Sequence, residues 1–215
     1  MTLVVFYIYY FIYNMNKWIV LLTAAVSNIT NTINDVEYRK YLYSKQILQW
    51  LVKTNYTIII VESSGYDFPN ITHDRLHKIT FKFDKTMPSS SQYEANSILY
   101  ALDNIKDCDF FKQCTHILKV TGRYFLPDVE KHLNSKPQDK DLYLQKHRKD
   151  DIKWQNSEYY GIRKELLESL LNDVKTSGLM EHALWKFSIG KSGCHIGYFE
   201  NNIRRGGDNL LIKNL

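Results

Sequence analysis

Long apolar runs and amphipathic stretches follow one another along the chain. Residues 18–25 (WIVLLTAA) and 56–62 (YTIIIVE) are apolar almost throughout, which is typical of strands buried on both faces of a parallel sheet. Residues 36–54 lie between them and carry apolar side chains at helical spacing, so we expect an amphipathic helix there. A strand, a helix and a second strand in this order indicate an α/β domain.

Later segments extend the same pattern. Pro88 and three serines precede a helix that we expect to run to about Ile105, with Ser91 as its N-cap and Glu94 completing a capping box. The other predicted elements are strands at 76–83, 115–120 and 141–146, helices at 127–133, 158–174 and 179–186, and a strand or loop at 187–199. Together they predict a single Rossmann-like α/β domain whose mostly parallel central sheet is flanked by helices.

Residues 2–13 (TLVVFYIYYFIY) form an apolar run that is too short to span a membrane, which takes about 20 residues. No basic segment precedes it, so a signal peptide is not indicated. Three interpretations stay open: a weak membrane anchor, an added edge segment of the fold, or translated sequence upstream of a start at Met15. We favour the last, which divides the chain into an extension, residues 1–14, and a domain, residues 15–215.

Composition narrows the class of function. The chain of 215 residues has a net charge of +5, which suits an anionic small ligand. The basic residues are scattered and form no motif that reads nucleic acid, so nucleic acid is not an expected partner. Cys108, Cys114 and Cys194 form no zinc-binding pattern and cannot all pair, so we expect reduced thiols and a cytoplasmic protein.

Small and polar residues follow the buried strands. In an open α/β sheet, ligands bind beyond the carboxyl ends of the strands, and the N-terminus of the helix at Ser90 can offer N–H groups to a phosphate. The residues expected at this edge are Thr23, Ala24, Glu62 and Ser63 after the first two strands, and Lys119, Thr121, Gly122 and Arg123 after the fourth. Lys119 and Arg123 add positive charge, so the sequence predicts a site for a nucleotide or a nucleotide sugar.

Each feature also has a purely structural explanation. Ser63-Ser64-Gly65 can be a turn, Ser91 and Glu94 a helix cap, and Lys119 a solvated charge. Thr121-Gly122-Arg123 is the hardest to explain in this way, because it places Gly and Arg together at the expected binding edge of a buried strand.

An Asp-x-Asp sequence, Asp107-Cys108-Asp109, matches the pattern with which many sugar transferases hold a divalent metal. It follows a predicted helix and precedes the fourth strand. It therefore belongs at the amino end of that strand, away from the expected site, and we interpret it as a solvated loop.

Five segments occur in an order that matches a known family: WIVLLTAA (18–25), IIIVESSG (58–65), SSSQYEANSILYAL (89–102), HILKVTGRYF (116–125) and SEYYGIRKELLESLL (157–171). Over about residues 15–199 the chain resembles glycosyltransferases of the GT-A fold. More narrowly, it resembles the small virus-encoded glycosyltransferases of large DNA viruses, including those linked to capsid glycans, and related bacterial polysaccharide enzymes. The resemblance implies a GT-A domain that moves a sugar from a nucleoside-diphosphate sugar to a glycan or glycoprotein hydroxyl, in the host cytoplasm if the protein is viral.

The resemblance also implies roles for individual residues of the donor site. By resemblance, Thr23, Ala24, Glu62 and Ser63 hold the base and ribose of the donor. The rest of the donor is held by Lys85, Ser90, Ser91 and Glu94. The Asp-x-Asp motif of the family is replaced by Thr121-Gly122-Arg123, which leaves a need for Mn²⁺ or Mg²⁺ with the donor open. Lys119 and Arg123 can neutralise the diphosphate leaving group in place of a cation.

The acceptor side of the expected site lies later in the chain. Residues 157–161 resemble the acceptor-facing stretch of the family, and Glu181 is the first candidate for the general base, followed by His182 and His195. We therefore expect an inverting hexosyl- or pentosyltransferase; the alternative is a non-catalytic module that binds a nucleotide or nucleic acid. Nucleotidyl transfer is disfavoured, because residues 23–26 (TAAV) stand where a glycine-rich loop would follow the first strand.

Overall fold

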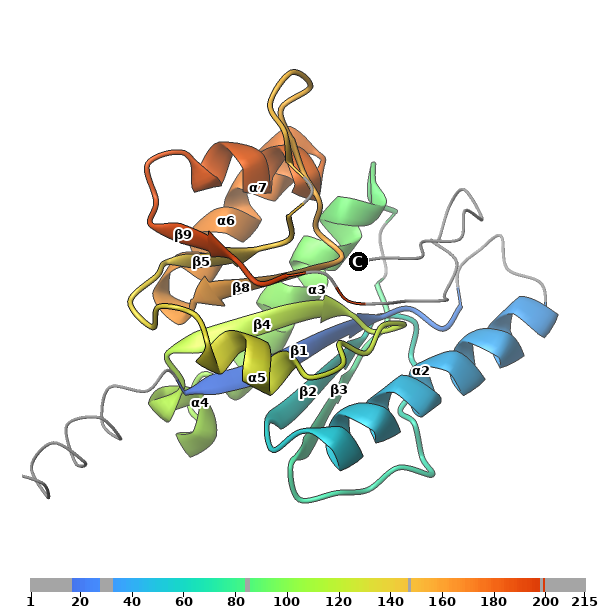
Figure 1. Ribbon diagram of the computed structural model, residues 1–215. Helices are drawn as coiled ribbons and strands as arrows, with labels where there is room; N and C mark the ends of the chain where they lie inside the picture. Colours follow the sequence, from blue (N-terminus) through green and yellow to red (C-terminus); the bar gives the residue numbers. More distant parts are fainter. Residues whose placement is uncertain (1–16, 28–32, 84–85, 147, 198, 200–215) are drawn as a thin grey trace, which may run out of the picture.

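A seven-stranded sheet forms the centre of the molecule (Figure 1). The structure, a computed structural model, describes residues 17–27, 33–83, 86–146, 148–197 and 199. The strands, in their order across the sheet, are β3 (Leu76–Thr80), β2 (Thr57–Glu62), β1 (Trp18–Ala24), β4 (His116–Thr121), β8 (Tyr159–Arg163), β5 (Leu142–Leu144) and β9 (Gly193–His195). Only β8 runs antiparallel to its neighbours among these strands, so the predicted mostly parallel sheet is confirmed.

Helices cover both faces of this sheet (Figure 1). One hydrophobic cluster joins the sheet to α2 (Ile33–Lys53) and α5 (Val129–Asn134). A second cluster on the opposite face joins it to α3 (Ser90–Ile105), α6 (Lys164–Ser177) and α7 (Met180–Ser188). A separate hairpin of β6 (Arg148–Lys149) and β7 (Trp154–Gln155) lies beside α7. The fold is therefore a three-layer α/β sandwich, with the core on both sides of β1, β2 and β4.

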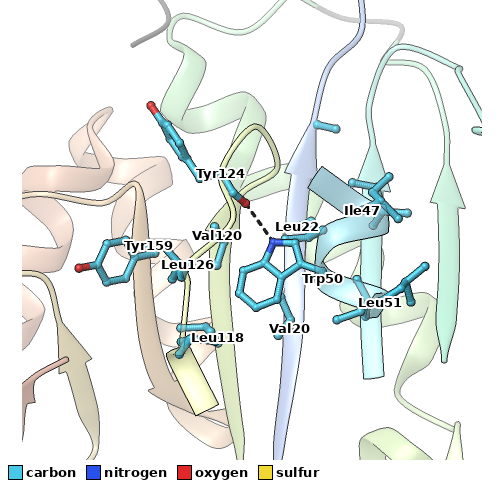
Figure 2. Close-up of a cluster of buried hydrophobic side chains, with 14 of the residues drawn as sticks. Val20, Leu22, Ile47, Trp50, Leu51, Leu118, Val120, Tyr124, Leu126 and Tyr159 are labelled. Atoms are coloured by element: carbon cyan, nitrogen blue, oxygen red, sulfur yellow. Dashed lines mark hydrogen bonds between the residues drawn. The ribbon is translucent and has the colours of Figure 1, made fainter. Parts of the chain in front are cut away.

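Trp50 on α2 anchors the first of these clusters. Its fully buried indole packs among side chains of β1 and β4, and its Nε1–H donates to the carbonyl of Tyr124 at 2.9 Å (Figure 2). Tyr124 lies in the turn that follows β4, so this bond ties the end of that strand to the helix on the same face.

Residues 158–174, which the sequence predicted as one helix, form a strand followed by a helix. The first part of this segment forms the buried strand β8, and α6 begins only at Lys164. Gly161 lets this strand pack closely, because a Cβ atom there would lie 2.8 Å from the ring of Trp18. The apolar residues of β8 face both clusters, so the strand shows no alternation, while the leucines of α6 impose a helical pattern on the window.

The capping box predicted at Ser91 and Glu94 is also wrong. The N-cap of α3 is Ser89, whose hydroxyl accepts from the N–H of Gln92, and Ser91 is buried. Glu94 contacts other elements instead.

The other predicted helices and strands are confirmed with small shifts of boundary. The predicted strand at 76–83 is the edge strand β3, and Asp107-Cys108-Asp109 lies before β4, at the start of α4 (Asp109–Gln113). Both aspartates are exposed there. No helix of the described ranges is long and apolar enough to cross a membrane. The extension at residues 1–14 and the start proposed at Met15 lie outside the described residues.

Candidate active site

The carboxyl ends of β1, β2 and β4 meet at one edge of the sheet. Thr23 on β1 pairs with Thr121 on β4, and Ala24 pairs with Glu62 on β2. The N–H of Ser63 donates to the carbonyl of Ala24 at 3.0 Å. The residues that the sequence placed after these three strands are thus neighbours across the sheet.

Glu62 organises the loops that follow β1 and β2. Its buried carboxylate accepts the N–H groups of Val26 at 2.8 Å, Ser64 at 2.9 Å and Tyr66 at 2.8 Å, and also the hydroxyl of Ser64. A carboxylate holding several N–H groups fixes the backbone around it. Glu62 therefore fixes the backbone of the loops at this edge of the sheet. Its carboxylate oxygens already accept hydrogen bonds from the chain itself.

Gly122 locks the turn after β4 against β1. Its N–H donates to the carbonyl of Thr23 at 2.8 Å, and a Cβ atom at this position would lie 2.8 Å from that same oxygen. The N–H of Tyr124 then closes the turn on the carbonyl of Thr121 at 3.0 Å. With the bond from Trp50, these contacts give the turn one defined position.

Lys119 lies at the centre of a buried polar network. Its Nζ lies 2.8 Å from Oε1 of Glu94, 2.9 Å from the carbonyl of Ser157 and 3.4 Å from the hydroxyl of Thr121. The hydroxyl of Thr23 donates to the same oxygen of Glu94 at 2.6 Å. The network joins α3 to β1, β4 and the segment before β8.

The surroundings of Lys119 change how it can act. Its side chain is 1% exposed and that of Glu94 20% exposed, so the alternative of a solvated charge is wrong. An ammonium group has three donors, and the three contacts of Lys119 use them. Lys119 therefore positions its neighbours, which differs from the free strand-end charge expected from the sequence.

Arg123 supplies the positive charge that stays near this edge. The half-buried guanidinium lies over the ring of Tyr124, with its Cζ 5.3 Å from the ring centroid. Burial pushes the pKa of Arg123 down, but Tyr43, Tyr124 and Glu94 push it up and the net shift is upward. The side chain thus keeps its charge across the working pH range.

Glu181 reaches the network from α7. The first turn of α7 carries it, and its Oε1 accepts the hydroxyl of the buried Ser157 at 2.8 Å. Because the carbonyl of Ser157 accepts from Lys119, one residue connects Glu181 to the buried pair of Lys119 and Glu94. Glu181 itself is half-buried, so its carboxylate can meet both solvent and the protein.

The remaining predicted residues lie on other elements or outside the described residues. Ser90 is exposed at the start of α3. His195 is exposed at the end of β9, and its Nδ1 lies 3.2 Å from the carbonyl of Gln145. His182 is exposed and packs edge-on against Trp154. Lys85 lies outside the described residues.

The turn after β4 does not supply the ligands of an Asp-x-Asp motif. Thr121-Gly122-Arg123 brings one hydroxyl and no carboxylate, and Glu94, which Lys119 links to it, is already bound by Thr23 and Lys119. Across the ranges that the structure describes, no three His, Cys, Asp or Glu side chains gather into a metal site. A divalent cation held in the family's manner does not fit these residues.

Sequence reasoning missed two residues that build the site. Ser157 was expected only as part of an acceptor-facing segment, although its hydroxyl and carbonyl connect Glu181 to Lys119. Ser89 was given no role, although its hydroxyl donates to the carbonyl of Gly178 at 2.5 Å and ties α3 to the end of α6. The sequence carries no signal for either contact, since each joins segments far apart along the chain.

Comparisons with known proteins agree with this architecture. No protein-family model and no curated protein matches the chain, whereas 47 solved chains match its structure. A protein assigned as a nucleotide-diphospho-sugar transferase from Desulfovibrio desulfuricans G20 is similar with a TM-score of 0.52 and 12% identity, over 85% of this chain and 80% of that one. The inositol-1-phosphate CTP transferase from T. maritima is similar with a TM-score of 0.51 and 16% identity, over 86% of each chain.

These likenesses, at such low identity, show the fold. The chain has the GT-A nucleotide-sugar transferase fold, as the resemblance implied. A glycosyltransferase involved in the glycosylation of the major capsid of PBCV-1 is less similar, with a TM-score of 0.39 and 6% identity over 74% of this chain and 66% of that one. That similarity is too low to support an inference about viral glycans.

Proposed function

We propose that this chain transfers a sugar from a nucleoside-diphosphate sugar to a hydroxyl group of a glycan or glycoprotein, in the cytoplasm and with inversion at the sugar carbon. The nucleotide would lie over the ends of β1 and β2, beside Thr23, Ala24 and Ser63. The diphosphate would lie toward the turn after β4 and the exposed start of α3 at Ser90.

The observation that carries this proposal is the placement of Arg123. Trp50, Gly122 and Tyr124 hold its turn at the carboxyl edge of the sheet. A guanidinium can bind a diphosphate through two parallel hydrogen bonds. Because it is fixed before the reaction, it can stabilise the charge that develops on the leaving group without reorganisation.

Glu181 is proposed as the general base. The acceptor oxygen forms a bond to the anomeric carbon while the bond from that carbon to the diphosphate breaks, and the nucleoside diphosphate leaves with the electron pair. The proton of the acceptor hydroxyl passes to Glu181, which Ser157 holds by a hydrogen bond. The exposed His195 is the second candidate for this proton.

Nucleotidyl transfer is the second candidate function, favoured by the likeness to the inositol-1-phosphate CTP transferase. It would release pyrophosphate from a nucleoside triphosphate. The loop after β1 continues as Ala25-Val26-Ser27, and its side chains leave less room for a triphosphate to approach the backbone than glycines would.

The products distinguish the two reactions. The purified chain would be incubated with UDP-, GDP- and CMP-sugars or with nucleoside triphosphates, each with and without Mn²⁺, and with added glycans. Sugar transfer predicts release of the nucleotide with a glycosylated product, and the Mn²⁺ arm measures metal dependence.

Glu181→Gln is expected to lower the rate by about a hundredfold or more, with the exposed Glu168→Gln on α6 as the matched control. Pyrophosphate release, or equal rates in both variants, would contradict the proposal.

A further inference from the structure

The outer face of α2 carries an exposed apolar stripe. Tyr38, Tyr41, Leu48 and Val52 are 60%, 62%, 49% and 75% exposed, and with the exposed Lys45 between them they follow a spacing of three and four residues. Residues at this spacing lie along one side of a helix. Most of the exposed large apolar side chains of the described chain belong to α2.

The core does not need this stripe. The opposite side of α2 supplies the buried residues Tyr43, Ile47, Trp50 and Leu51, which pack on the sheet. Figure 1 shows α2 as the outermost layer of the described chain on its side of the molecule. Aligned apolar groups left in water on a helix that is already anchored indicate an interaction surface.

The chemistry of the helix favours a lipid surface over a protein partner. Tyrosines place an apolar ring and a polar tip at a membrane interface, and a lysine within an apolar stripe can extend its ammonium to the headgroups. The basic residues Arg39, Lys40, Lys45 and Lys53 outnumber the acidic Asp35 and Glu37 on α2, and the whole chain carries a net charge of +5. Both features attract anionic headgroups.

We propose that α2 lies flat on an anionic membrane surface, with Tyr38, Tyr41, Leu48 and Val52 in the headgroup region and Lys45 bound to lipid phosphates. A helix of its 21 residues extends about 30 Å, enough for such a contact along its length.

Vesicle sedimentation with the full chain tests the proposal. Vesicles of phosphatidylcholine alone and of phosphatidylcholine with phosphatidylserine would be compared for the wild type, the double variant Leu48→Ser/Val52→Ser and the charge variant Lys45→Glu. We expect the wild type to bind the anionic vesicles. Both variants should bind the same vesicles with an affinity at least about tenfold lower. The double variant Ile152→Ser/Ile189→Ser replaces exposed aliphatic residues elsewhere and should bind as the wild type does.

Two outcomes would overturn the proposal. Equal binding by the wild type and the α2 variants would mean that another part of the chain meets the membrane. No binding to vesicles, together with a dimer in light scattering that Leu48→Ser/Val52→Ser dissociates, would assign the stripe to a second copy of the chain. Because the varied residues are exposed, circular dichroism should show that the variants stay folded.

Discussion

Disrupting the ion pair of Lys119 and Glu94 should lower the free energy of unfolding more than disrupting any other polar contact of the site. Their side chains are 1% and 20% exposed, and their charged atoms lie 2.8 Å apart. Removing one partner from such a pair leaves the other charge without compensation in a poorly solvated place. Their function is therefore to fix geometry: they hold Thr23 on one side and Ser157 on the other.

We predict that Lys119→Met destabilises the fold by about 3 kcal/mol, measured by urea unfolding. The double variant Lys119→Met/Glu94→Leu should recover part of this loss, because it removes the stranded carboxylate as well. Lys186→Met, at an exposed position on α7, is the matched control and should change stability little. A Lys119→Met variant as stable as the control would mean that the pair does not hold the site.

His116 gives the fold a dependence on pH. Its Nε2 lies 2.9 Å from the carbonyl of Lys140, and its Nδ1 lies 3.0 Å from the hydroxyl of Thr115, which accepts the N–H of Lys17. A neutral ring with its proton on Nε2 satisfies both contacts. Burial lowers the pKa of His116 from its usual 6.5, with Arg163 acting in the same direction.

The sign of the pH effect follows from the lowered pKa. Above about 6.5 the ring is neutral in both the folded and the unfolded chain, and stability is complete. As the pH falls below that value, the unfolded chain takes up the proton first, so stability decreases. Urea midpoints measured from about pH 7 to pH 5 should fall less steeply in His116→Gln than in the wild type. Parallel slopes in the two proteins would contradict this assignment.

At the level of elements, the site depends on how closely β4 approaches its neighbours. Gly122 lies against the carbonyl of Thr23 on β1, and Gly161 on β8 lies against the ring of Trp18. Neither contact leaves room for a methyl group. Backbone packing at Gly122 therefore sets the position of the turn that carries Arg123, whereas Gly161 holds β8 close to Trp18 at the start of β1.

Alanine substitutions test these two approaches. Gly122→Ala and Gly161→Ala should each cost about 1–3 kcal/mol by overpacking, seen as lower melting temperatures, and Gly122→Ala should also weaken nucleotide binding. Gly193→Ala is the matched control, because a Cβ atom there would lie 3.7 Å from its nearest neighbour, an ordinary contact. Gly122→Ala with the stability and affinity of the wild type would show that the turn is not held as described.

The sequence predicted β1 and β2 well because each is a nearly continuous apolar run, and it predicted β4 although Lys119 interrupts the apolar residues of that strand. Their shared binding edge followed from the geometry of parallel strands alone. β8 could not be recognised, since it has only five residues and the helical spacing of the leucines in α6 follows it directly. The burial of Lys119 was equally hidden, because it depends on where α3 places Glu94 across the sheet.

At the level of the whole molecule, the reactivity of the three cysteine thiols measures how much of the folded core is accessible to solvent. Cys114 is buried between α4 and β4, and burial raises the pKa of its thiol to about 12. Cys108 and Cys194 are half-buried, and burial also raises the pKa of Cys194. A thiol reacts as its thiolate, so Cys114 is doubly protected in the folded molecule.

We predict stepwise labelling by a thiol reagent at about pH 8. Cys108 should react first and Cys194 more slowly, while Cys114 should react only as fast as the whole domain unfolds. Increasing urea should accelerate the labelling of Cys114 in proportion to global unfolding. Mass spectrometry of the labelled peptides measures the rate at each cysteine. Three thiols that react together without denaturant would contradict a core closed on this side of the sheet.

The central claim is that the carboxyl edge of the sheet binds a nucleoside diphosphate through Arg123. Isothermal titration with UDP and with GDP, without added metal, tests it most directly. The wild type should bind at least one of them, and Arg123→Ala should weaken that binding about tenfold or more, as expected for a lost charged hydrogen bond. Arg163→Ala is the matched control, because Arg163 pairs with Asp141 at the opposite edge of the sheet. Equal affinities in the wild type and Arg123→Ala, or no binding of either nucleotide, would contradict the account.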